Sequence, residues 1–366
     1  GIAQGSGGGQ LGSDRNRDSG ERRNENDQGI TAAVFMKAAV LHAAARVENR
    51  PLVISDYSDP KPGPGELLLR VTACGVCRTD LHIIEGELPL HKNPLIPGHQ
   101  IVGVVEGCGD GVDVVLGKRV GVSWVGGIDG TCAYCKRGEE NLCDAPHFTG
   151  YDVDGGYAEY VVADADFVYS LPDELDDLHA APLLCAGIIG FRALRVAGVQ
   201  PGEYVGLYGF GSSAHLALPV LRAWGCRVAV ATRGERHRAF AQHLGADWIG
   251  GPLERPPEPL DRAVTFAPAG DVVIAALGAL RKGGVVAINA IHLDRMPEFD
   301  YDSLLWGERQ IRSVANMTRT DATDFLKLAA EIKLDPEITL FSLDDANSAV
   351  AAVKGDQLDG AAVIVI

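Results

Sequence analysis

The sequence lacks three features, and each absence excludes a class of protein. It has no run approaching the roughly 18–20 consecutive apolar residues of a membrane-spanning helix, so we expect no membrane anchor. Its eight cysteines in 366 residues are too few for a secreted domain held together by disulfides. It also lacks an excess of positive charge. With 33 Lys and Arg against 49 Asp and Glu, the net charge of −16 would repel a nucleic acid.

The sequence does contain enough apolar side chains for a sizeable core. Hydrophobic residues make up 46% of it and charged residues 22%, which is close to the globular average and excludes a wholly disordered chain. Its length is that of about two domains.

The character of the sequence changes along the chain. Residues 1–35 are rich in Gly, Asn and charge and lack the apolar segment of a secretory signal, so we expect a disordered tail, either an upstream extension or an added remnant before Met36. Short β-like runs broken by Gly and Pro predict a β-rich domain over 36–182. Apolar strands alternating with helical stretches predict βαβ units and a parallel sheet over 183–316. We expect the final segment, 317–366, to return to the first domain.

Three potential zinc ligands stand far apart in the sequence: Cys77, His99 and Cys185. Zinc favours Cys thiolates and His nitrogens, and a catalytic zinc keeps three protein ligands and one open position. Spacing alone does not join residues so distant. Two buried thiols and a core histidine therefore remain an alternative at this point.

A second set of potential ligands lies in one Gly-rich segment. Cys132 and Cys135 have the spacing of a zinc knuckle, Cys143 closes a loop of suitable size, and Asp129 stands where a fourth ligand belongs. A closed structural zinc site takes four ligands. A redox Cys-x-x-Cys is the alternative, but it would leave Cys143 unexplained, so we favour structural zinc.

A dinucleotide-binding turn follows an apolar strand and opens a helical stretch. It comprises Gly209, Gly211, Ser212, Ser213 and Ala214. Gly209 allows the tight turn, Gly211 lets the backbone approach a pyrophosphate, and Ala214 permits close packing of helix on strand.

The end of the next strand indicates which nicotinamide cofactor binds. The strand ends without the acidic residue that would hold a ribose 2′-hydroxyl, and Thr232, Arg233 and Arg236 are found there instead. Arginine suits a 2′-phosphate, so we favour NADP(H) over NAD(H), with two merely solvated arginines as the alternative.

With these motifs in this order, the chain from Met36 to Ile366 resembles the zinc-dependent medium-chain alcohol dehydrogenases. The resemblance implies an α/β fold, with a β-rich GroES-like catalytic domain and a Rossmann domain with a doubly wound parallel sheet. It implies two Zn²⁺ per chain, the catalytic one on Cys77, His99 and Cys185 and the structural one on Asp129, Cys132, Cys135 and Cys143.

The resemblance also implies roles for residues around the catalytic zinc. Asp80 would steady a ligand such as His99. Thr79 would bind the alcohol oxygen and start a proton relay to His82, and Arg78 would contact the cofactor pyrophosphate. Trp124, expected on the strand before the Asp129 lobe, matches a position that lines the substrate pocket in relatives, with a plain core residue as the alternative. Together with Leu88 and Ile189, it suggests an apolar substrate pocket.

The chain departs from the family pattern at four positions. Gln100 replaces a glutamate thought to assist ligand exchange at zinc, and Asp129 replaces the first structural cysteine. Ile189 stands where a threonine is common, and Ala361 where many relatives carry an arginine for the pyrophosphate. We expect altered exchange at the catalytic zinc, a weaker structural site and greater reliance on Arg78.

The predicted function is zinc-dependent hydride transfer between a nicotinamide cofactor and a primary alcohol or aldehyde. The alternatives are a non-catalytic NADPH-binding zinc protein, such as a redox sensor or structural partner, and a quinone-reductase-like enzyme. We expect a cytoplasmic homodimer or homotetramer, because thiolate ligands need a reducing compartment and the family forms such oligomers. The remaining cysteines, Cys74, Cys108 and Cys226, are expected to be small buried hydrophobic residues.

Overall fold

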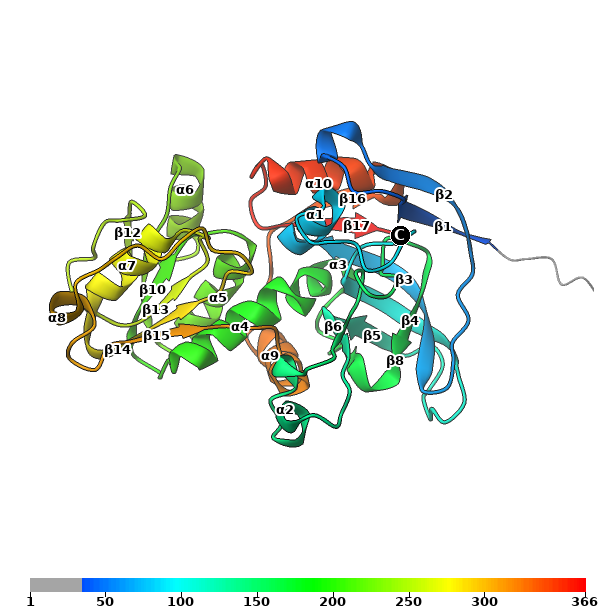
Figure 1. Cartoon of the computed structure of the whole chain (residues 1–366), viewed down its shortest axis with the longest axis horizontal. Helices are drawn as coiled ribbons and strands as arrows, with labels where there is room; N and C mark the ends of the chain where they lie inside the picture. Colours follow the sequence, from blue (N-terminus) through cyan, green and yellow to red (C-terminus); the bar gives the residue numbers. More distant parts are fainter. Residues whose placement is uncertain (1–34) are drawn as a thin grey trace, which may run out of the picture. The chain divides into compact units, whose positions relative to one another are not determined.

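Two large sheets organise residues 35–366, the part of the chain that the computed structural model describes (Figure 1). The expected tail falls almost entirely on residues 1–34, which lie outside the described residues. From Phe35 onward, the chain forms one compact unit.

The first sheet has six strands, all parallel, in the order β12-β11-β10-β13-β14-β15. Its strands are β10 (Tyr204–Tyr208), β11 (Arg227–Ala231), β12 (Trp248–Gly250), β13 (Leu260–Thr265), β14 (Leu280–Ile288) and β15 (Gln310–Ser313). The strand order reverses between β10 and β13, which is the arrangement of a doubly wound dinucleotide-binding sheet. The predicted fold class is therefore confirmed.

Both faces of this sheet are buried because alternate side chains pack on opposite helical layers. Val205 and Leu207 belong to the core cluster that includes α4 (Ala186–Ala197) and α5 (Ser212–Ala223). Tyr204 and Tyr208 point the other way, into the cluster that includes α7 (Gly270–Ala279). The remaining helices around this sheet are α6 (Glu235–His243) and α8 (Tyr301–Leu304).

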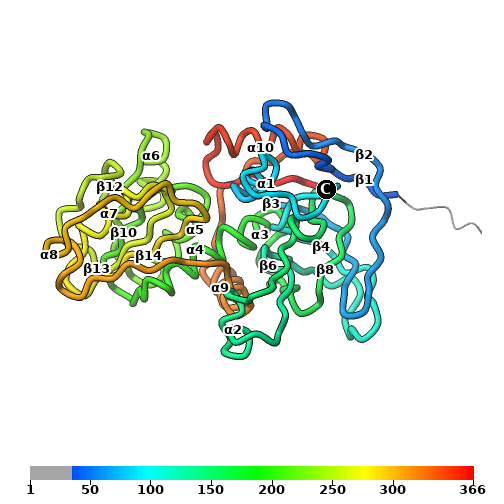
Figure 2. The backbone as a smooth tube through the Cα atoms, in the orientation of Figure 1, coloured from blue at the N-terminus to red at the C-terminus, as the bar shows by residue number. Residues whose placement is uncertain are grey.

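The second sheet is mostly antiparallel and runs in the order β16-β17-β3-β4-β5-β9, with β8 also paired to β3. Its strands are β3 (Glu66–Val76), β4 (Gln100–Cys108), β5 (Arg119–Val122), β8 (Tyr160–Asp164), β9 (Val168–Ser170), β16 (Ile338–Ser342) and β17 (Ala361–Val365). β17 pairs antiparallel with β3, so the C-terminal strand lies in the sheet built from the first half of the described chain (Figure 2).

Smaller elements complete this half of the molecule. They are the strand pairs β1 (Phe35–Leu41) with β2 (Leu52–Ser58) and β6 (Val125–Gly127) with β7 (His147–Phe148), and the helices α1 (Arg78–Glu85), α2 (Ala133–Lys136), α3 (Asp177–Ala180), α9 (Arg319–Glu331) and α10 (Ala346–Lys354).

One expectation about the cysteines is wrong. Cys74 and Cys226 are buried, but Cys108 is exposed, because it is the last residue of β4, at the rim of the sheet.

Within residues 35–366, no single helix has the length and apolar character to cross a membrane. Two successive helical segments reach that length and apolar character only when they are counted together. They are Asp177–Leu184 and Ala186–Ala197, and the angle between them is 44°.

Phe325 on α9 belongs to the largest core cluster and provides a test of the packing. Its side chain is 0% exposed, contacts the ring of Phe191 on α4 at a centroid distance of 5.6 Å, and occupies the space beside Gly187. We expect Phe325→Ala to lower the free energy of unfolding by about 3–5 kcal/mol, measured by urea titration with circular dichroism. The control Leu253→Ala, at a side chain 58% exposed, should change it by less than about 0.5 kcal/mol. Equal effects of the two variants would contradict this packing.

Candidate active site

The site begins where β3 runs into α1. Cys77 is the N-cap of α1, and its Sγ accepts a hydrogen bond from the backbone N–H of Thr79 at 3.3 Å. The Asp80 carboxylate in turn accepts a hydrogen bond from the backbone N–H of Cys77 at 2.8 Å. This reciprocal cap places the Cys77 sulfur and the Asp80 carboxylate side by side at the helix start.

Asp80 orients His99. Both side chains are fully buried, with His99 Nδ1 3.0 Å from Asp80 Oδ1 and the Tyr157 hydroxyl donating to Asp80 Oδ2 at 3.2 Å. The carboxylate holds the proton on Nδ1, which leaves Nε2 as the free lone pair of the ring. Nε2 is buried and has no hydrogen-bond partner among residues 35–366.

The structure brings Cys185 to the same place. Cys185 lies at the N-terminus of α4, and its sulfur, the Cys77 sulfur and a His99 ring nitrogen all lie within 4.8 Å of one another. Two sulfurs and an unpartnered imidazole nitrogen are the donor set of a three-ligand zinc site, so these residues fit the ion.

The charges of this cluster also favour a cation. Hydrogen bonding from Cys185 lowers the pKa of Cys77 against the opposing effect of burial, and the same contact raises the pKa of Cys185. Burial alone would lower the pKa of His99, but the negative charges of Asp80 and Cys77 raise it to about 10. The cluster therefore holds buried negative charge on Asp80 and Cys77. A divalent cation would neutralise the same negative charge.

An aromatic wall borders the cluster. Trp124 meets His99 edge-on at 5.1 Å between ring centroids and stacks on Phe148 at 4.7 Å and on Tyr151 at 5.9 Å. Trp124 lies in a bend between β5 and β6, not on a strand as expected, because pairing of β5 ends at Val122.

The other predicted residues near the cluster lie on α1 and at the start of α4. Thr79 is buried, and His82 is partly exposed and pairs with Glu87. Arg78 is exposed, and its guanidinium donates to the carbonyl of Val353 on α10 at 3.3 Å. The two remaining predicted pocket residues are Leu88, in the loop after α1, and Ile189, on α4 four residues beyond Cys185.

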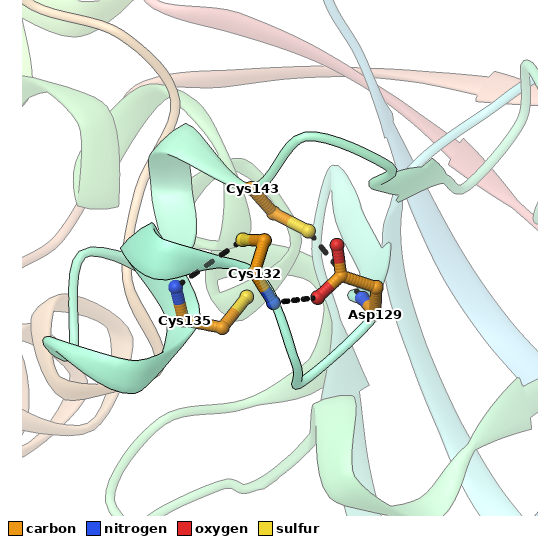
Figure 3. Close-up of side chains that lie close together, drawn as sticks. All are labelled: Asp129, Cys132, Cys135 and Cys143. Carbon is orange, nitrogen blue, oxygen red and sulfur yellow. Dashed lines mark hydrogen bonds between the residues drawn. The ribbon is translucent and has the colours of Figure 1, made fainter.

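The structure also brings together the ligands of the second predicted metal site. Ligand atoms of Asp129, Cys132, Cys135 and Cys143 lie within 4.8 Å of one another (Figure 3). The Cys132 sulfur accepts the N–H of Cys135 at 3.4 Å, and the Cys143 sulfur accepts the N–H of Asp129 at 3.3 Å. The hydrogen bond from the Cys135 N–H lowers the pKa of Cys132, and the thiolate is the form that binds zinc.

Asp129 has a folding role in this lobe as well. Its Oδ1 accepts the backbone N–H groups of Thr131 at 2.6 Å and Cys132 at 2.8 Å. The hydrogen bonds from Cys132 and Thr131 lower the pKa of Asp129 to about 2, so the carboxylate is charged at neutral pH. One oxygen shapes the turn, and the second can serve as a ligand.

The dinucleotide-binding turn lies at the carboxyl end of β10, beside the point where the strand order reverses. Gly209 has a φ of +88°, and a Cβ there would be 2.9 Å from the backbone N of Ala267. At Gly211 a Cβ would meet nothing within 4 Å, so this glycine leaves an open cradle. Ser212 and Ser213 begin α5, whose first N–H groups have no partner within the helix, and Ala214 is buried against the sheet. The cradle fits a pyrophosphate.

The residues after β11 differ in exposure. Thr232 is 2% exposed, whereas Arg233 and Arg236 are exposed. Arg236 is not a free cation, because its Nε donates to Asp359 at 2.7 Å.

Sequence reasoning missed Tyr157, Phe148 and Tyr151. They reach the site through pairings such as the Tyr157–Asp80 hydrogen bond, which spans 77 positions of sequence, so no local motif marks them.

The comparisons with known proteins decide the family. The alcohol dehydrogenase GroES-like domain family matches residues 63–173. The Mycobacterium tuberculosis protein named "Probable alcohol dehydrogenase AdhA" is 46% identical over 337 residues, covering 90% of this chain and 97% of its own. The chain belongs to the zinc-type medium-chain alcohol dehydrogenase family.

Solved structures agree with this assignment. A cinnamyl alcohol dehydrogenase (SbCAD4) from Sorghum bicolor superposes with a TM-score of 0.81 at 26% identity, covering 91% of this chain and 98% of its own. Acetophenone reductase from Geotrichum candidum, in complex with NAD, superposes with a TM-score of 0.80 at 25% identity, covering 91% and 97%. The function of this alcohol dehydrogenase is therefore the interconversion of alcohols and carbonyl compounds, as predicted.

Asp129 provides a test of the second metal group. A thiolate is a softer ligand than a carboxylate, so we expect Asp129→Cys to slow the release of zinc to a chromogenic chelator. Asp129→Asn keeps an acceptor for the N–H groups of Thr131 and Cys132 but loses the charge, and should release zinc faster than the wild type. Identical release from all three proteins would show that residue 129 is not a ligand.

Proposed function

We propose that this alcohol dehydrogenase depends on zinc bound by Cys77, His99 and Cys185 and uses NADP(H) on primary alcohols and aldehydes. The observation that carries the proposal is the convergence of these three side chains within 4.8 Å from three distant segments. The buried and unpartnered Nε2 of His99 supports it, since such an atom is costly unless it binds something.

When bound, zinc would act as a Lewis acid on the alcohol or carbonyl oxygen of the substrate. The chain's own residues then have separate tasks. Asp80 keeps the proton on His99 Nδ1 and so keeps Nε2 available as a ligand. Thr79, next to Cys77, would hydrogen-bond the substrate oxygen, and His82, on the same helix and nearer to solvent, would receive or return the proton.

The aromatic wall supports an apolar pocket. The Trp124 ring contacts the rings of both Phe148 and His99, and Leu88 and Ile189 are further proposed pocket residues. Such a surface excludes water from the reacting atoms and favours substrates with an apolar body.

The cofactor assignment rests on the edge of the parallel sheet. The cradle at Gly211 and the N-terminus of α5 suit the pyrophosphate, and Arg78 could contact it from α1. At the adenosine end, the sequence after β11 offers Arg233 and Arg236, which favours a 2′-phosphate over a 2′-hydroxyl.

The second zinc would be structural. Four ligands leave no open position, and the lobe is tied to the segment before α9 by Asn141, whose amide donates to the carbonyl of Ala315 at 2.9 Å. The oligomeric state and the cytoplasmic location stay predictions.

Replacing His99 tests the catalytic zinc. We expect His99→Ala to lower the zinc content from two ions per chain to one and to reduce aldehyde reduction by at least about 100-fold, because loss of a ligand should exceed the 10–100-fold effect of losing its hydrogen-bond partner. Zinc is measured by atomic emission and activity by the loss of NADPH absorbance. The control His42→Ala, at an exposed histidine, should change neither. Near-normal reduction by His99→Ala would refute the assignment.

The cofactor preference is tested separately. We expect a lower KM for NADPH than for NADH, and an increase of about tenfold in the KM for NADPH in Arg233→Ala, since a charge-assisted hydrogen bond contributes about 1.5–3 kcal/mol. The KM for NADH should not change in this variant. A clear preference of the wild type for NADH would contradict the proposal.

A further inference from the structure

We propose that Asp359 is a specificity-determining residue for the cofactor: its carboxylate holds the Arg236 guanidinium and so opposes binding of the 2′-phosphate of NADPH. The inference rests on the proposed function, in which Arg236 is one of the residues that receive this phosphate.

The contact joins two distant parts of the chain. Arg236 lies in the first turn of α6, directly after the strand end where the adenosine ribose would bind. Its Nε donates to Asp359 Oδ1 at 2.7 Å, across 123 positions of sequence. Figure 2 shows α6 and the red segment that follows α10, which carries Asp359. A carboxylate from the segment before β17 thus lies beside an arginine that follows β11.

Asp359 is presented by a segment with little freedom to move. The next residue, Gly360, has a φ of +80°, and a Cβ there would be 2.0 Å from the carbonyl oxygen of Glu337. The backbone N–H of Ala361 donates to that same carbonyl at 2.9 Å, at the start of β17. The backbone next to Asp359 is therefore held against the chain that leads into β16.

The two cofactors respond differently to this carboxylate. A phosphate and a carboxylate compete for one guanidinium, and their negative charges repel each other. A ribose 2′-hydroxyl is uncharged and can donate a hydrogen bond to a carboxylate. Asp359 should therefore weaken the binding of NADPH but not that of NADH.

The size of the effect follows from the exposure of the pair. The Arg236 and Asp359 side chains are 41% and 48% exposed, so water and salt screen their attraction. Such surface pairs change an equilibrium constant by up to about fivefold.

A neighbouring pair provides a matched control. Asp356 lies in the same segment and faces His237 Nε2 at 3.6 Å, one residue along α6. Asp356→Asn removes the same charge from the same segment but leaves the contact between Arg236 and Asp359 in place.

The experiment measures dissociation constants for NADPH and NADH by fluorescence titration of the zinc-loaded protein at low ionic strength. We expect Asp359→Asn to lower the dissociation constant for NADPH about two- to fivefold and to leave that for NADH unchanged or slightly raised. Asp356→Asn should change neither dissociation constant by as much. In an Arg236→Ala background, the effect of Asp359→Asn on NADPH should be clearly smaller.

The outcomes separate this inference from the proposed function. If Arg236→Ala weakens NADPH binding but Asp359→Asn changes nothing, or strengthens both cofactors equally, the inference about Asp359 is overturned and the proposed cofactor preference stands. If Asp356→Asn lowers the dissociation constant for NADPH as much as Asp359→Asn does, the effect comes from the charge of the whole segment and not from the contact with Arg236, and the inference is overturned. If Arg236→Ala leaves NADPH binding unchanged, the phosphate-binding role of Arg236 fails, and the inference fails with it.

Discussion

The buried carboxylate of Asp80 is the interaction on which the arrangement of the site depends. It accepts hydrogen bonds from the Cys77 backbone and the Tyr157 hydroxyl, and it faces His99 Nδ1. Burying a charge is costly unless hydrogen bonds replace its hydration, so these three partners must stay in place for the fold to be stable. The same contacts set the start of α1, the orientation of the imidazole and the position of the Cys77 sulfur. The geometry of the candidate zinc site is therefore a consequence of satisfying one buried acid.

The third ligand, Cys185, is positioned by a different constraint, the packing of the segment just before α4 on the second sheet. Leu184 occupies the space beside Gly121 on β5, where a Cβ would come within 2.5 Å of the leucine side chain. Its carbonyl also accepts a hydrogen bond from the buried Ser123 hydroxyl at 2.5 Å. The next residue, Cys185, begins α4, which packs on β13 and β14 of the parallel sheet. The ligand set therefore includes a residue at the junction of the two sheets, next to the edge where the cofactor is proposed to bind.

The departure at Gln100 can be understood from the same charges. Gln100 is 1% exposed, pairs with Gly75 on β3 and follows His99 directly. A glutamate there would bury another negative charge directly after the ligand His99, and a buried charge without a partner is costly. The neutral amide avoids that cost, but it also removes an anionic oxygen that could compete for a bound cation. The substitution is thus expected to favour retention of the ion over exchange.

Sequence proximity explains which parts of the site could be predicted from the sequence. The Asp129 lobe and the turn at Gly209 are built from residues a few positions apart, so the spacing of these residues in the sequence indicates their geometry. The central strands β10, β11, β13 and β14 of the parallel sheet could be read from their apolar runs because both faces of the sheet are buried there. The aromatic wall, the Tyr157–Asp80 hydrogen bond and the contact between Arg236 and Asp359 join distant residues, and only the packed core brings them together. The absence of an acid at the end of β11 was a correct observation about the motif. It was an incomplete description of the charges there, because the tertiary fold adds a carboxylate that no local pattern contains.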